Sequence, residues 1–431
     1  METSDIIILS ILLGCMATYI PVFMCLFFTA TLGFVIFTDL PLLLLAQTLF
    51  RSMDNFALVV VLFFILCGNI MTAGSIVEKL IKVANALVSW LPGGLGMAGV
   101  LACGLFGAIS GSTVATVVAL GGFMIPALIK HGYPEQYTIG LMTTSPNLGV
   151  IIPPSIGMIL FSMISNVSLE GLFLTGFLPG VMIMLGVCVY TYLLFRKRTE
   201  ITRMPIPNAK ETLAVLKEGF WSLMLPVIIF GGIFSGIFTA NEAAVVACVY
   251  AFIVELFIHK SMKLSQVKEI TVSSAVTSAT LLIIVAGATC FGRLLTLESI
   301  PGRITETVLS AIQSPMLFLF AMNVLLLFVG MFMDIISATM ILGPVFLPML
   351  QAFDISWMHF GLIMTVNLAI GYCTPPMGVS LYITGAMANR NLIYVSKAVI
   401  PFIVIQMIVL GIITYMPDMV LWLPRFFGYL E

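Results

Sequence analysis

The sequence predicts an all-α polytopic membrane protein made of two inverted-topology repeats, each with a re-entrant helical hairpin and a proline-broken helix. Three observations lead to this fold class: an apolar composition, prolines that recur at one fixed offset, and polar segments inside otherwise apolar runs. The composition predicts that the chain lies in a lipid bilayer. The offset predicts that the two halves are repeats, and the polar segments predict the position of the functional site.

The composition is that of a chain built for a bilayer. Of 431 residues, 61% are hydrophobic and 9% are charged, against roughly 45–50% and ~25% in soluble domains. Apolar runs of 17 or more residues recur along the chain, and each can cross a ~30 Å hydrocarbon layer. Lipid offers no partner to an open strand edge, so the spans must be helical. The net charge of −1 argues against a nucleic-acid partner.

The distribution of Lys and Arg predicts the orientation. The longest polar interruption, residues 196–218, is also the densest basic stretch, which predicts a cytoplasmic linker between two halves. The chain then crosses the membrane twice and reaches a second basic loop at 259–268. The N-terminus carries Glu2 and Asp5 and no basic residue, which indicates a first membrane helix rather than a cleavable signal peptide. We therefore expect residue 1 outside, the linker inside and the C-terminus outside.

The two halves are related by a fixed offset. Four prolines recur 222 positions later (375 − 153 = 222), together with two glycines and a Met-Thr pair. The same order of elements with a reversed starting side indicates an inverted-topology repeat, which is chiefly a transporter device with its site near the midplane. The pairs are Pro126 and Pro348, Pro153 and Pro375, Pro154 and Pro376, Pro179 and Pro401, Gly121 and Gly343, Gly149 and Gly371, Met142 and Met364, and Thr143 and Thr365.

A polar tip interrupts an apolar run in the first half. The segment "GAISGSTVATVV" (107–118) places Ser110, Gly111, Ser112 and Thr113 between two apolar arms. Each arm is short for a comfortable span, so a re-entrant hairpin fits better. Non-helical backbone at membrane depth is tolerated where it is buried in protein or lines a cavity. The alternative is a flexible glycine kink between two ordinary helices.

The matching tip of the second half carries a carboxylate. Asp334 stands 222 positions after Ser112, inside the apolar stretch "GMFMDIISATMILGPVFLP" (330–348). A charge at that depth is costly and marks a functional site by default. Oxygen ligands suit Na⁺, and Ser337 and Thr339 follow on the same segment. The alternative is a structural aspartate that caps a broken helix, and the two roles are compatible.

A second break follows each hairpin. The segments "SPNLGVIIPPSIG" (145–157) and "NLAIGYCTPPMG" (367–378) each contain paired prolines. Such prolines remove backbone donors and leave upstream carbonyls unpaired, and half-helix ends of this kind hold ions and anionic substrates in transporters. The residues that we assign to these breaks are Asn147, Pro153, Pro154 and Ser155 in the first half, and Asn367, Thr374, Pro375, Pro376 and Gly378 in the second.

Other chemistry finds little support. No GK dipeptide exists, so no P-loop for ATP is present. The eight cysteines lie singly in apolar runs, which is typical of small buried residues. We expect no catalytic residue and no organic cofactor. Charged amphipathic stretches precede each hairpin, at 72–92 and 295–313, and they predict helices that lie at the membrane interface.

The longest motifs resemble a known family. The stretches "LFGAISGSTVATVVALGGFMIPALIKHGY", "GVIIPPSIGMILF" and "VGMFMDIISATMILGPVFLPM" are similar to the large membrane subunit of TRAP transporters, the tripartite ATP-independent periplasmic systems. The likeness runs over nearly the whole chain. One departure is Ala240-Asn241-Glu242 in "IFTANEAA", where the family usually has Pro-Thr-Glu.

The resemblance implies a Na⁺-driven, elevator-type secondary transporter of the bacterial inner membrane, with a periplasmic N-terminus. It also implies a separate small membrane subunit, a periplasmic substrate-binding protein and a small carboxylate substrate. The division that we expect is scaffold helices at 1–71 and 219–294, interfacial arms at 72–92 and 295–313, transport-domain segments at 93–165 and 314–390, a membrane helix at 166–195, the linker at 196–218, and a C-terminal membrane helix and tail at 391–431.

Alternatives remain at this stage. A standalone Na⁺/dicarboxylate symporter would share the hairpins but need no binding protein. An ion channel would need a continuous lumen with a ring of filter residues, and a membrane enzyme would need a convergent set of His, Cys or carboxylates. We expect a C4-dicarboxylate or similar organic acid as substrate, with a sialic or other sugar acid as the second choice.

Overall fold

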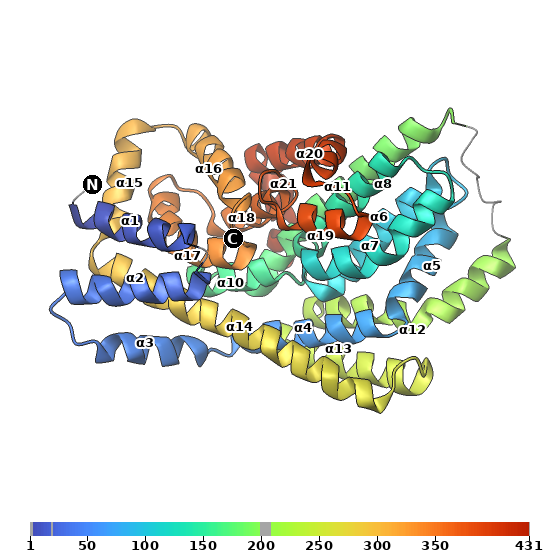
Figure 1. Ribbon diagram of the computed structural model, residues 1–431, viewed down its shortest axis with the longest axis horizontal. Coiled ribbons are helices and arrows are strands. Elements are labelled where there is room, and N and C mark those ends of the chain that lie inside the picture. Colours follow the sequence, from blue (N-terminus) through green and yellow to red (C-terminus); the bar gives the residue numbers. More distant parts are fainter. Residues whose placement is uncertain (1–2, 19, 199–207, 431) are drawn as a thin grey trace.

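The protein is all-helical, as the sequence predicts. The computed structural model describes residues 3–18, 20–198 and 208–430, and within these ranges it contains helices and turns but no strand. Eight described helices are long and apolar enough to cross a membrane, or nine if the bent pair α3 (Leu43–Met53) and α4 (Ala57–Ala73) forms one span. The chain is therefore a multi-pass membrane protein (Figure 1).

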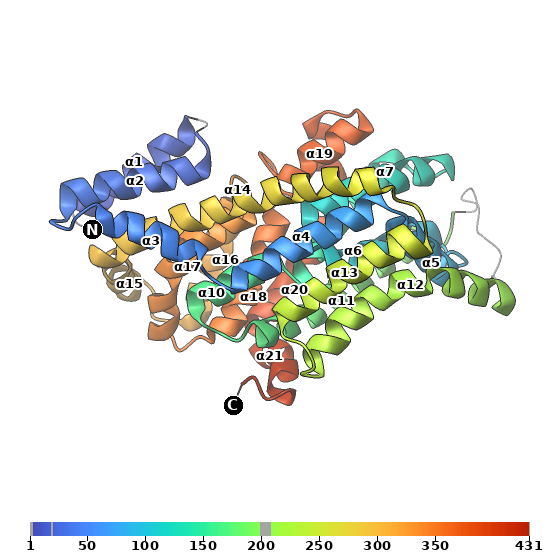
Figure 2. The same ribbon diagram turned by 90° about the horizontal axis from the view of Figure 1, so that it is seen from below.

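The first helices of each half pack against each other. In the first half these are α1 (Thr3–Ala17), α2 (Val22–Phe37), α3 and α4; in the second half they are α12 (Ala209–Phe234), α13 (Ala240–Ile253) and α14 (Leu264–Leu297). Helix α14 contacts α2, α3 and α4, and α13 contacts α4, and Figure 2 shows α4, α13 and α14 side by side. The expected linker, 196–218, differs in one respect, because α12 already begins at Ala209 within that range. Residues 199–207 of the range lie outside the described residues.

Helix–break–helix units follow in both halves. The first is α6 (Gly94–Ser110) with α7 (Thr113–Lys130), and the second is α16 (Pro315–Gly330) with α17 (Ile335–Ala352). Helices α7 and α17 each have 18 residues and start 222 positions apart (335 − 113 = 222). Each predicted polar tip therefore lies at the break between two helices, and α7 and α17 match in length.

The broken helices come next. In the first half, α8 (Glu135–Thr144), a 3₁₀ turn (Ser145–Asn147) and α9 (Leu148–Ile151) lead to α10 (Ile156–Ser165). In the second half, α18 (Trp357–Gly371) leads to α19 (Val379–Ala388). Each half closes on a long helix, α11 (Leu169–Phe195) or α20 (Leu392–Tyr415). The C-terminal tail, for which the sequence indicated no helix, holds the short α21 (Pro417–Phe426).

One glycine pair in each half lets a hairpin touch the broken helix that follows it. A Cβ atom added at Gly149 would lie 3.3 Å from the Cα of Gly107, and one added at Gly330 would lie 3.1 Å from the Cα of Gly371. Backbone thus packs directly on backbone at both places. A contact of this kind therefore occurs in both halves.

A buried carboxylate holds each helix that precedes a hairpin. The N-terminus of α5 (Ile76–Val88) donates two backbone N–H groups, from Ser75 and Ile76, to Glu255 at 2.8 Å each. In α15 (Ile300–Ala311), Arg303 pairs with the buried Asp5 of α1. Figure 1 shows α5 and α15 at opposite ends of the molecule, running across the direction of α14. Both helices are therefore anchored by a residue from the other half of the chain.

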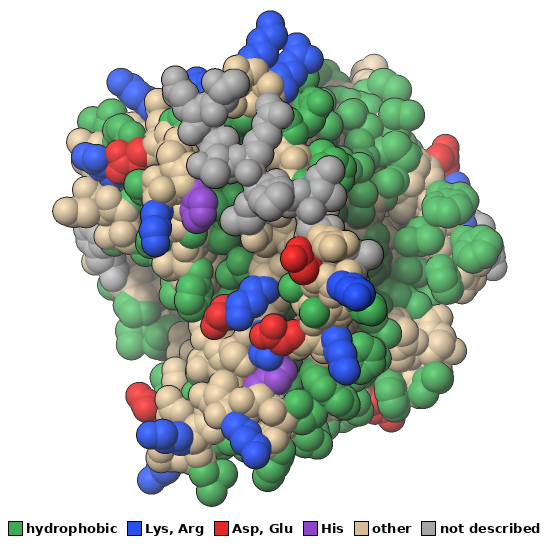
Figure 3. All heavy atoms as spheres, turned by 90° about the vertical axis from the view of Figure 1, so that its right-hand side faces the viewer, with side chains coloured by type: hydrophobic (Ala, Val, Ile, Leu, Met, Phe, Trp, Pro, Cys, Tyr) green, Lys and Arg blue, Asp and Glu red, His purple; other side chains and the backbone are tan. Residues whose placement is uncertain are grey.

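Basic side chains gather at one end of the molecule. Figure 3 looks onto the end that carries α5 and the start of α12, and Lys and Arg are spread over it. Lys79 and Lys82 of α5 both approach Glu218 of α12 there, at 3.6 and 3.7 Å. This is the end at which α11 ends and α12 begins.

We predict that Gly107→Ala lowers the free energy of unfolding by about 1–3 kcal/mol, because overpacking a tight contact has that cost. The added methyl group would collide with the Cα of Gly149 and lie 2.8 Å from its nitrogen. Thermal unfolding of the purified protein in detergent measures the effect. Gly231→Ala is the matched control, since a Cβ on Gly231 meets nothing within 4 Å. Equal melting temperatures for the two variants would contradict the tight contact.

Candidate functional site

The tip of the first hairpin rests on the first proline break. Helix α6 ends at Ser110, and the residue that caps it, Gly111, has a φ of +60°, in the left-handed region that favours glycine. Ser112 then caps α7 by accepting a hydrogen bond from the backbone N–H of Ala115 at 3.4 Å. A Cβ on Gly111 would lie 2.8 Å from the carbonyl oxygen of Pro154. The structure therefore brings the predicted tip and the predicted break into contact.

Hydroxyl oxygens collect at this tip. The hydroxyls of Ser110 and Thr116 lie 3.2 Å apart, and Thr116 donates to the carbonyl of Ser112 at 2.7 Å. The Thr113 and Ser145 hydroxyls are buried, and neither has a hydrogen-bond partner among the described residues. Buried polar groups are normally paired, so such unpaired oxygens call for an explanation such as a bound ion.

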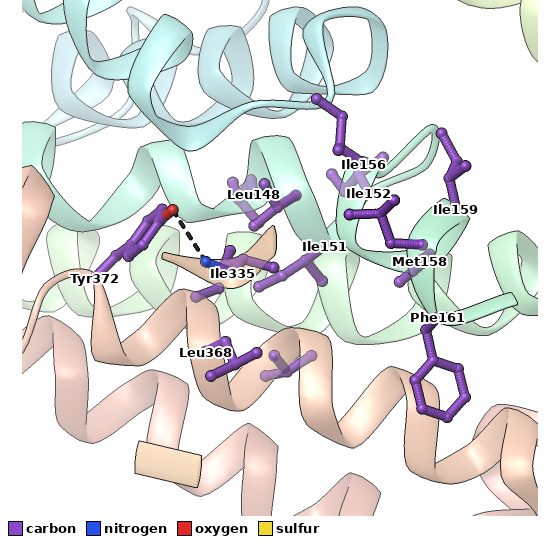
Figure 4. Packing of buried hydrophobic residues seen from close by; sticks show 14 of the residues in the cluster. Leu148, Ile151, Ile152, Ile156, Met158, Ile159, Phe161, Ile335, Leu368 and Tyr372 are labelled. Atoms are coloured by element: carbon purple, nitrogen blue, oxygen red, sulfur yellow. Dashed lines mark hydrogen bonds between the residues drawn. The ribbon is translucent and has the colours of Figure 1, made fainter. Parts of the chain in front are cut away.

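Asp334 occupies the matching place in the second hairpin. It caps α17 by accepting a hydrogen bond from the N–H of Ser337 at 3.0 Å, as Ser112 caps α7. The backbone N–H of Ile335 donates to the hydroxyl of Tyr372 at 3.2 Å (Figure 4). Asp334 therefore caps the N-terminus of α17, which is the structural alternative that the sequence left open. The Ser337 hydroxyl is buried and has no partner in the described part of the chain, and Thr339, two residues further along the helix, is also buried.

The two proline breaks differ in exposure. Pro153, Pro154 and Ser155 are buried, and Ser155 caps α10 by accepting from the N–H of Met158 at 3.4 Å. Pro375 and Pro376 are exposed. Thr374 is half-buried and donates to the carbonyl of Ile370 at 2.8 Å, while Gly378 is buried at the start of α19. The sequence presents the breaks as equivalent, but the fold opens only the second one to its surroundings.

Asn147 belongs to a buried network that joins the two halves. Its amide donates to Gln406 of α20 at 3.0 Å, and Gln406 donates to the carbonyl of Thr144 at 3.0 Å. The Cys373 thiol, beside the second break, donates to the carbonyl of Thr143 at 3.2 Å and approaches the Asn147 side-chain oxygen at 3.4 Å. The partners of Asn147 are therefore in α20 and the second break.

Asn367 has a corresponding network in the second half. Its amide donates to Asn323 of α16, whose own amide donates to Thr414 of α20 at 3.0 Å. The side-chain oxygen of Asn367 is buried and accepts no hydrogen bond from the described residues. This oxygen remains available to a ligand.

The two sets of residues meet through apolar contact. Figure 4 shows Leu148, Ile151 and Ile156 of the first broken helix near Ile335 of the second hairpin and Leu368 of α18. A Cβ on Gly157 would lie 2.8 Å from Cγ2 of Ile335. Helices α10 and α17 pack together, as do α7 and α19. Each hairpin therefore packs on a helix of the other half.

The donor set favours a hard cation. It consists of hydroxyls, amide oxygens, backbone carbonyls and one carboxylate, and oxygen ligands of this kind suit alkali and alkaline-earth ions. Within the described ranges, no group of three or more His, Cys, Asp or Glu could hold a metal ion. The side chains at the tips and breaks thus offer mainly oxygen atoms, the ligands that alkali and alkaline-earth ions prefer.

Sequence reasoning missed several of these residues. Ser145 could have been found, because it stands 222 positions before Asn367. Gln406 is a polar residue inside the apolar run "PFIVIQMIVL", which is itself a signal of a functional or structural role at membrane depth. Nothing in the sequence distinguishes Cys373 from the other seven cysteines, or Thr116 from other helix threonines.

Comparisons with known proteins identify relatives. The family described as "Tripartite ATP-independent periplasmic transporter, DctM component" matches residues 9–419. The C4-dicarboxylate TRAP transporter large permease protein DctM of Rhodobacter capsulatus is 35% identical, with 99% of this chain and 100% of the relative covered. The isethionate TRAP transporter permease protein DctMQ of Oleidesulfovibrio alaskensis is 36% identical, covering 90% of this chain and 61% of the relative.

A solved structure has a similar fold. The YdaH transporter of Alcanivorax borkumensis matches with a TM-score of 0.64 and 16% sequence identity, covering 86% of this chain and 88% of that chain. At this identity the likeness concerns the helical architecture alone.

We predict that Gln406→Leu lowers the free energy of unfolding by about 1–3 kcal/mol, because it leaves the buried Asn147 amide without its partner. Thermal unfolding in detergent measures the change. Gln351→Leu is the control, since Gln351 is exposed on α17. A Gln406→Leu variant that melts with the parent protein would show that the network adds no stability.

Proposed function

Because this chain belongs to the DctM family of tripartite ATP-independent periplasmic transporters, we propose that it imports an organic acid into the cell, driven by Na⁺. In this proposal the two hairpin tips and the two proline breaks form the ion and substrate sites. The observation that carries the proposal is the set of buried, unpartnered oxygens on Thr113, Ser337 and Asn367. All three residues belong to segments that break the helical pattern in the sequence.

Sodium would supply the missing partner of these oxygens. An ion at the first tip would find the Thr113 hydroxyl, and an ion at the start of α17 would find the Ser337 hydroxyl and the Asp334 carboxylate. The unpartnered oxygens of Ser145 and Asn367 belong to the broken helix that follows each hairpin. A lone charge is costly at membrane depth, so the negative Asp334 carboxylate and a bound positive ion would each offset the cost of the other. Bound ions would then order both tips before the substrate arrives.

We further propose an elevator mechanism. The hairpins and broken helices, at 93–165 and 314–390, would move as a transport domain, and the other spans would form the scaffold. The glycine contacts support this division, because backbone-to-backbone packing joins each hairpin to its broken helix. The arms α5 and α15 would connect the moving and fixed parts, each anchored by a carboxylate, Glu255 or Asp5.

Partners and orientation follow from the family. We propose a separate small membrane subunit and a periplasmic binding protein that delivers the acid, in the bacterial inner membrane. The fused name of the isethionate relative, DctMQ, supports a companion subunit. The basic end in Figure 3 favours a cytoplasmic linker and a periplasmic N-terminus.

The substrate is a small organic anion. The names of the two relatives give a C4-dicarboxylate for one and isethionate, a sulfonate, for the other. We propose a C4-dicarboxylate or similar carboxylate for this chain. The second candidate, a standalone Na⁺/dicarboxylate symporter, differs in one testable respect, since it needs no binding protein.

Uptake into proteoliposomes tests the proposed function. We expect labelled succinate to enter vesicles that hold this chain and its small subunit only when a Na⁺ gradient and the cognate binding protein are both present. Omitting each component in turn separates the hypotheses. Uptake without the binding protein would favour the standalone symporter, and uptake without Na⁺ would contradict the proposed coupling.

A second prediction concerns the charge on Asp334. Asp334→Asn keeps an oxygen that can cap α17 but removes the negative charge, so we expect normal insertion and melting with loss of Na⁺-dependent uptake. Asp39→Asn, in an exposed turn, is the matched control. The measurement is initial uptake against Na⁺ concentration. An Asp334→Asn protein with the Na⁺ dependence of its parent would reduce Asp334 to a helix cap.

A further inference from the structure

A large cleft lies outside the site described above. It has a volume of about 780 Å³ and separates α3 and α14 on one side from α10 and α17 on the other. That volume is within the range of ~300–1,000 Å³ found for small-molecule sites. None of the predicted ion or substrate residues lines the cleft.

The two walls of the cleft differ in chemistry. The wall of α3 and α14 presents Gln47, Arg51, Asn55, Thr289, Arg293 and Thr296. The opposite wall presents methionine, isoleucine, leucine and proline side chains. Gln47 and Arg51 are four residues apart, as are Thr289 and Arg293, so each pair shares one helix face. The cleft is therefore basic on the proposed scaffold side and apolar on the proposed transport side.

The arginines of the cleft are unusual in their pairing. Four arginines belong to α3, α14, α15 and α21, in that order: Arg51, Arg293, Arg303 and Arg425. Arg303 pairs with Asp5, and Arg425 pairs with Asp418 at 2.7 Å. Arg51 and Arg293 are exposed and form no ion pair with any acid in the described ranges. Of these four arginines, the two that pair with no acid among the described residues thus line the same cleft.

The cleft borders the second hairpin. Its lining residues on α14 run from Val285 to Thr296, in the last third of that helix, and those on α17 run from Met340 to Pro348. Met340 is six residues beyond Asp334, which corresponds to ~9 Å along a helix axis. An anion held in the cleft would be close to the proposed ion site.

We propose that the cleft is an anion-binding vestibule, in which Arg51 and Arg293 capture the organic acid before it reaches the hairpin tips. Guanidinium groups bind carboxylates with paired, charge-assisted hydrogen bonds, and two separate guanidiniums match an acid with two charges. The apolar wall makes no hydrogen bond to the bound acid, so the transport domain can slide past while the scaffold holds the anion. This inference rests on the proposed direction of transport, and it adds a second binding site to it.

Thiol labelling tests the vestibule without requiring uptake. Thr296 is exposed at the cleft, so a Thr296→Cys variant in proteoliposomes should react with a charged, membrane-impermeant maleimide. We expect succinate, at constant ionic strength set with chloride, to slow this reaction at least about threefold. Ser310→Cys, exposed on α15 outside the cleft, is the matched control and should be unaffected. The parent chain, with its eight native cysteines, gives the background rate.

The arginine variants decide the result. Arg51→Gln and Arg293→Gln should each abolish protection of Thr296→Cys, Arg51→Lys should retain part of it, and Arg425→Gln should leave it intact. In uptake assays the two glutamine variants should raise KM by about tenfold with little change in kcat, which corresponds to the loss of one charged hydrogen-bonded pair.

Several outcomes would overturn the vestibule. One is an equal labelling rate of the Thr296→Cys variant, with both arginines intact, in the presence and absence of succinate, isethionate or N-acetylneuraminate. Another is protection that persists when both arginines are replaced. A third is an arginine variant that changes KM only by weakening the binding protein's affinity for the chain, while succinate gives no protection of the cysteine. That result would show that the arginines dock the binding protein. Protection without Na⁺-driven uptake would instead support the vestibule and contradict the proposed coupling.

Discussion

The constraint on which the structure depends is that lipid supplies no hydrogen-bond partner. Every polar atom at the depth of the hairpin tips must be met by the chain itself or by something the chain binds. Ser112 and Asp334 accept hydrogen bonds from the N-termini of α7 and α17, and the Asn147 amide donates to Gln406. Thr113 and Ser337 keep buried oxygens that no described residue satisfies. The requirement that fixes the helix ends therefore also marks the positions where an ion would complete the site.

Close glycine packing joins each hairpin to the broken helix that follows it. At Gly107 and Gly149, and again at Gly330 and Gly371, backbone approaches backbone with no side chain between. The cleft between α14 and α17 is different, because its α17 wall consists of apolar side chains. The contacts between each hairpin and its broken helix are tight. The side chains that α17 presents to the cleft are apolar and offer no hydrogen bond. That contrast is what a sliding mechanism requires.

Much of this architecture could be predicted from the sequence, because its features violate ordinary helical patterns. The proline offset identified the corresponding elements, and the polar tips identified the breaks. The Asn147–Gln406 contact could not be predicted, since which face of α20 meets the core depends on tertiary packing. Apolar helices in a bilayer are apolar on all sides, so periodicity does not separate lipid-facing from protein-facing residues. The same limit hid the basic wall of the cleft, whose two arginines lie 242 positions apart (293 − 51 = 242).

The two halves share a design but not a role. Ser112 and Asp334 make the same cap, yet only the second brings a charge to the tip. Pro153 and Pro154 are buried while Pro375 and Pro376 are exposed, so only the second break is open to its surroundings. The cleft also borders α17 rather than α7. Charge, exposure and access thus converge on the second hairpin. Under the proposed function, the first tip would serve mainly to hold an ion, while the second would also receive the substrate.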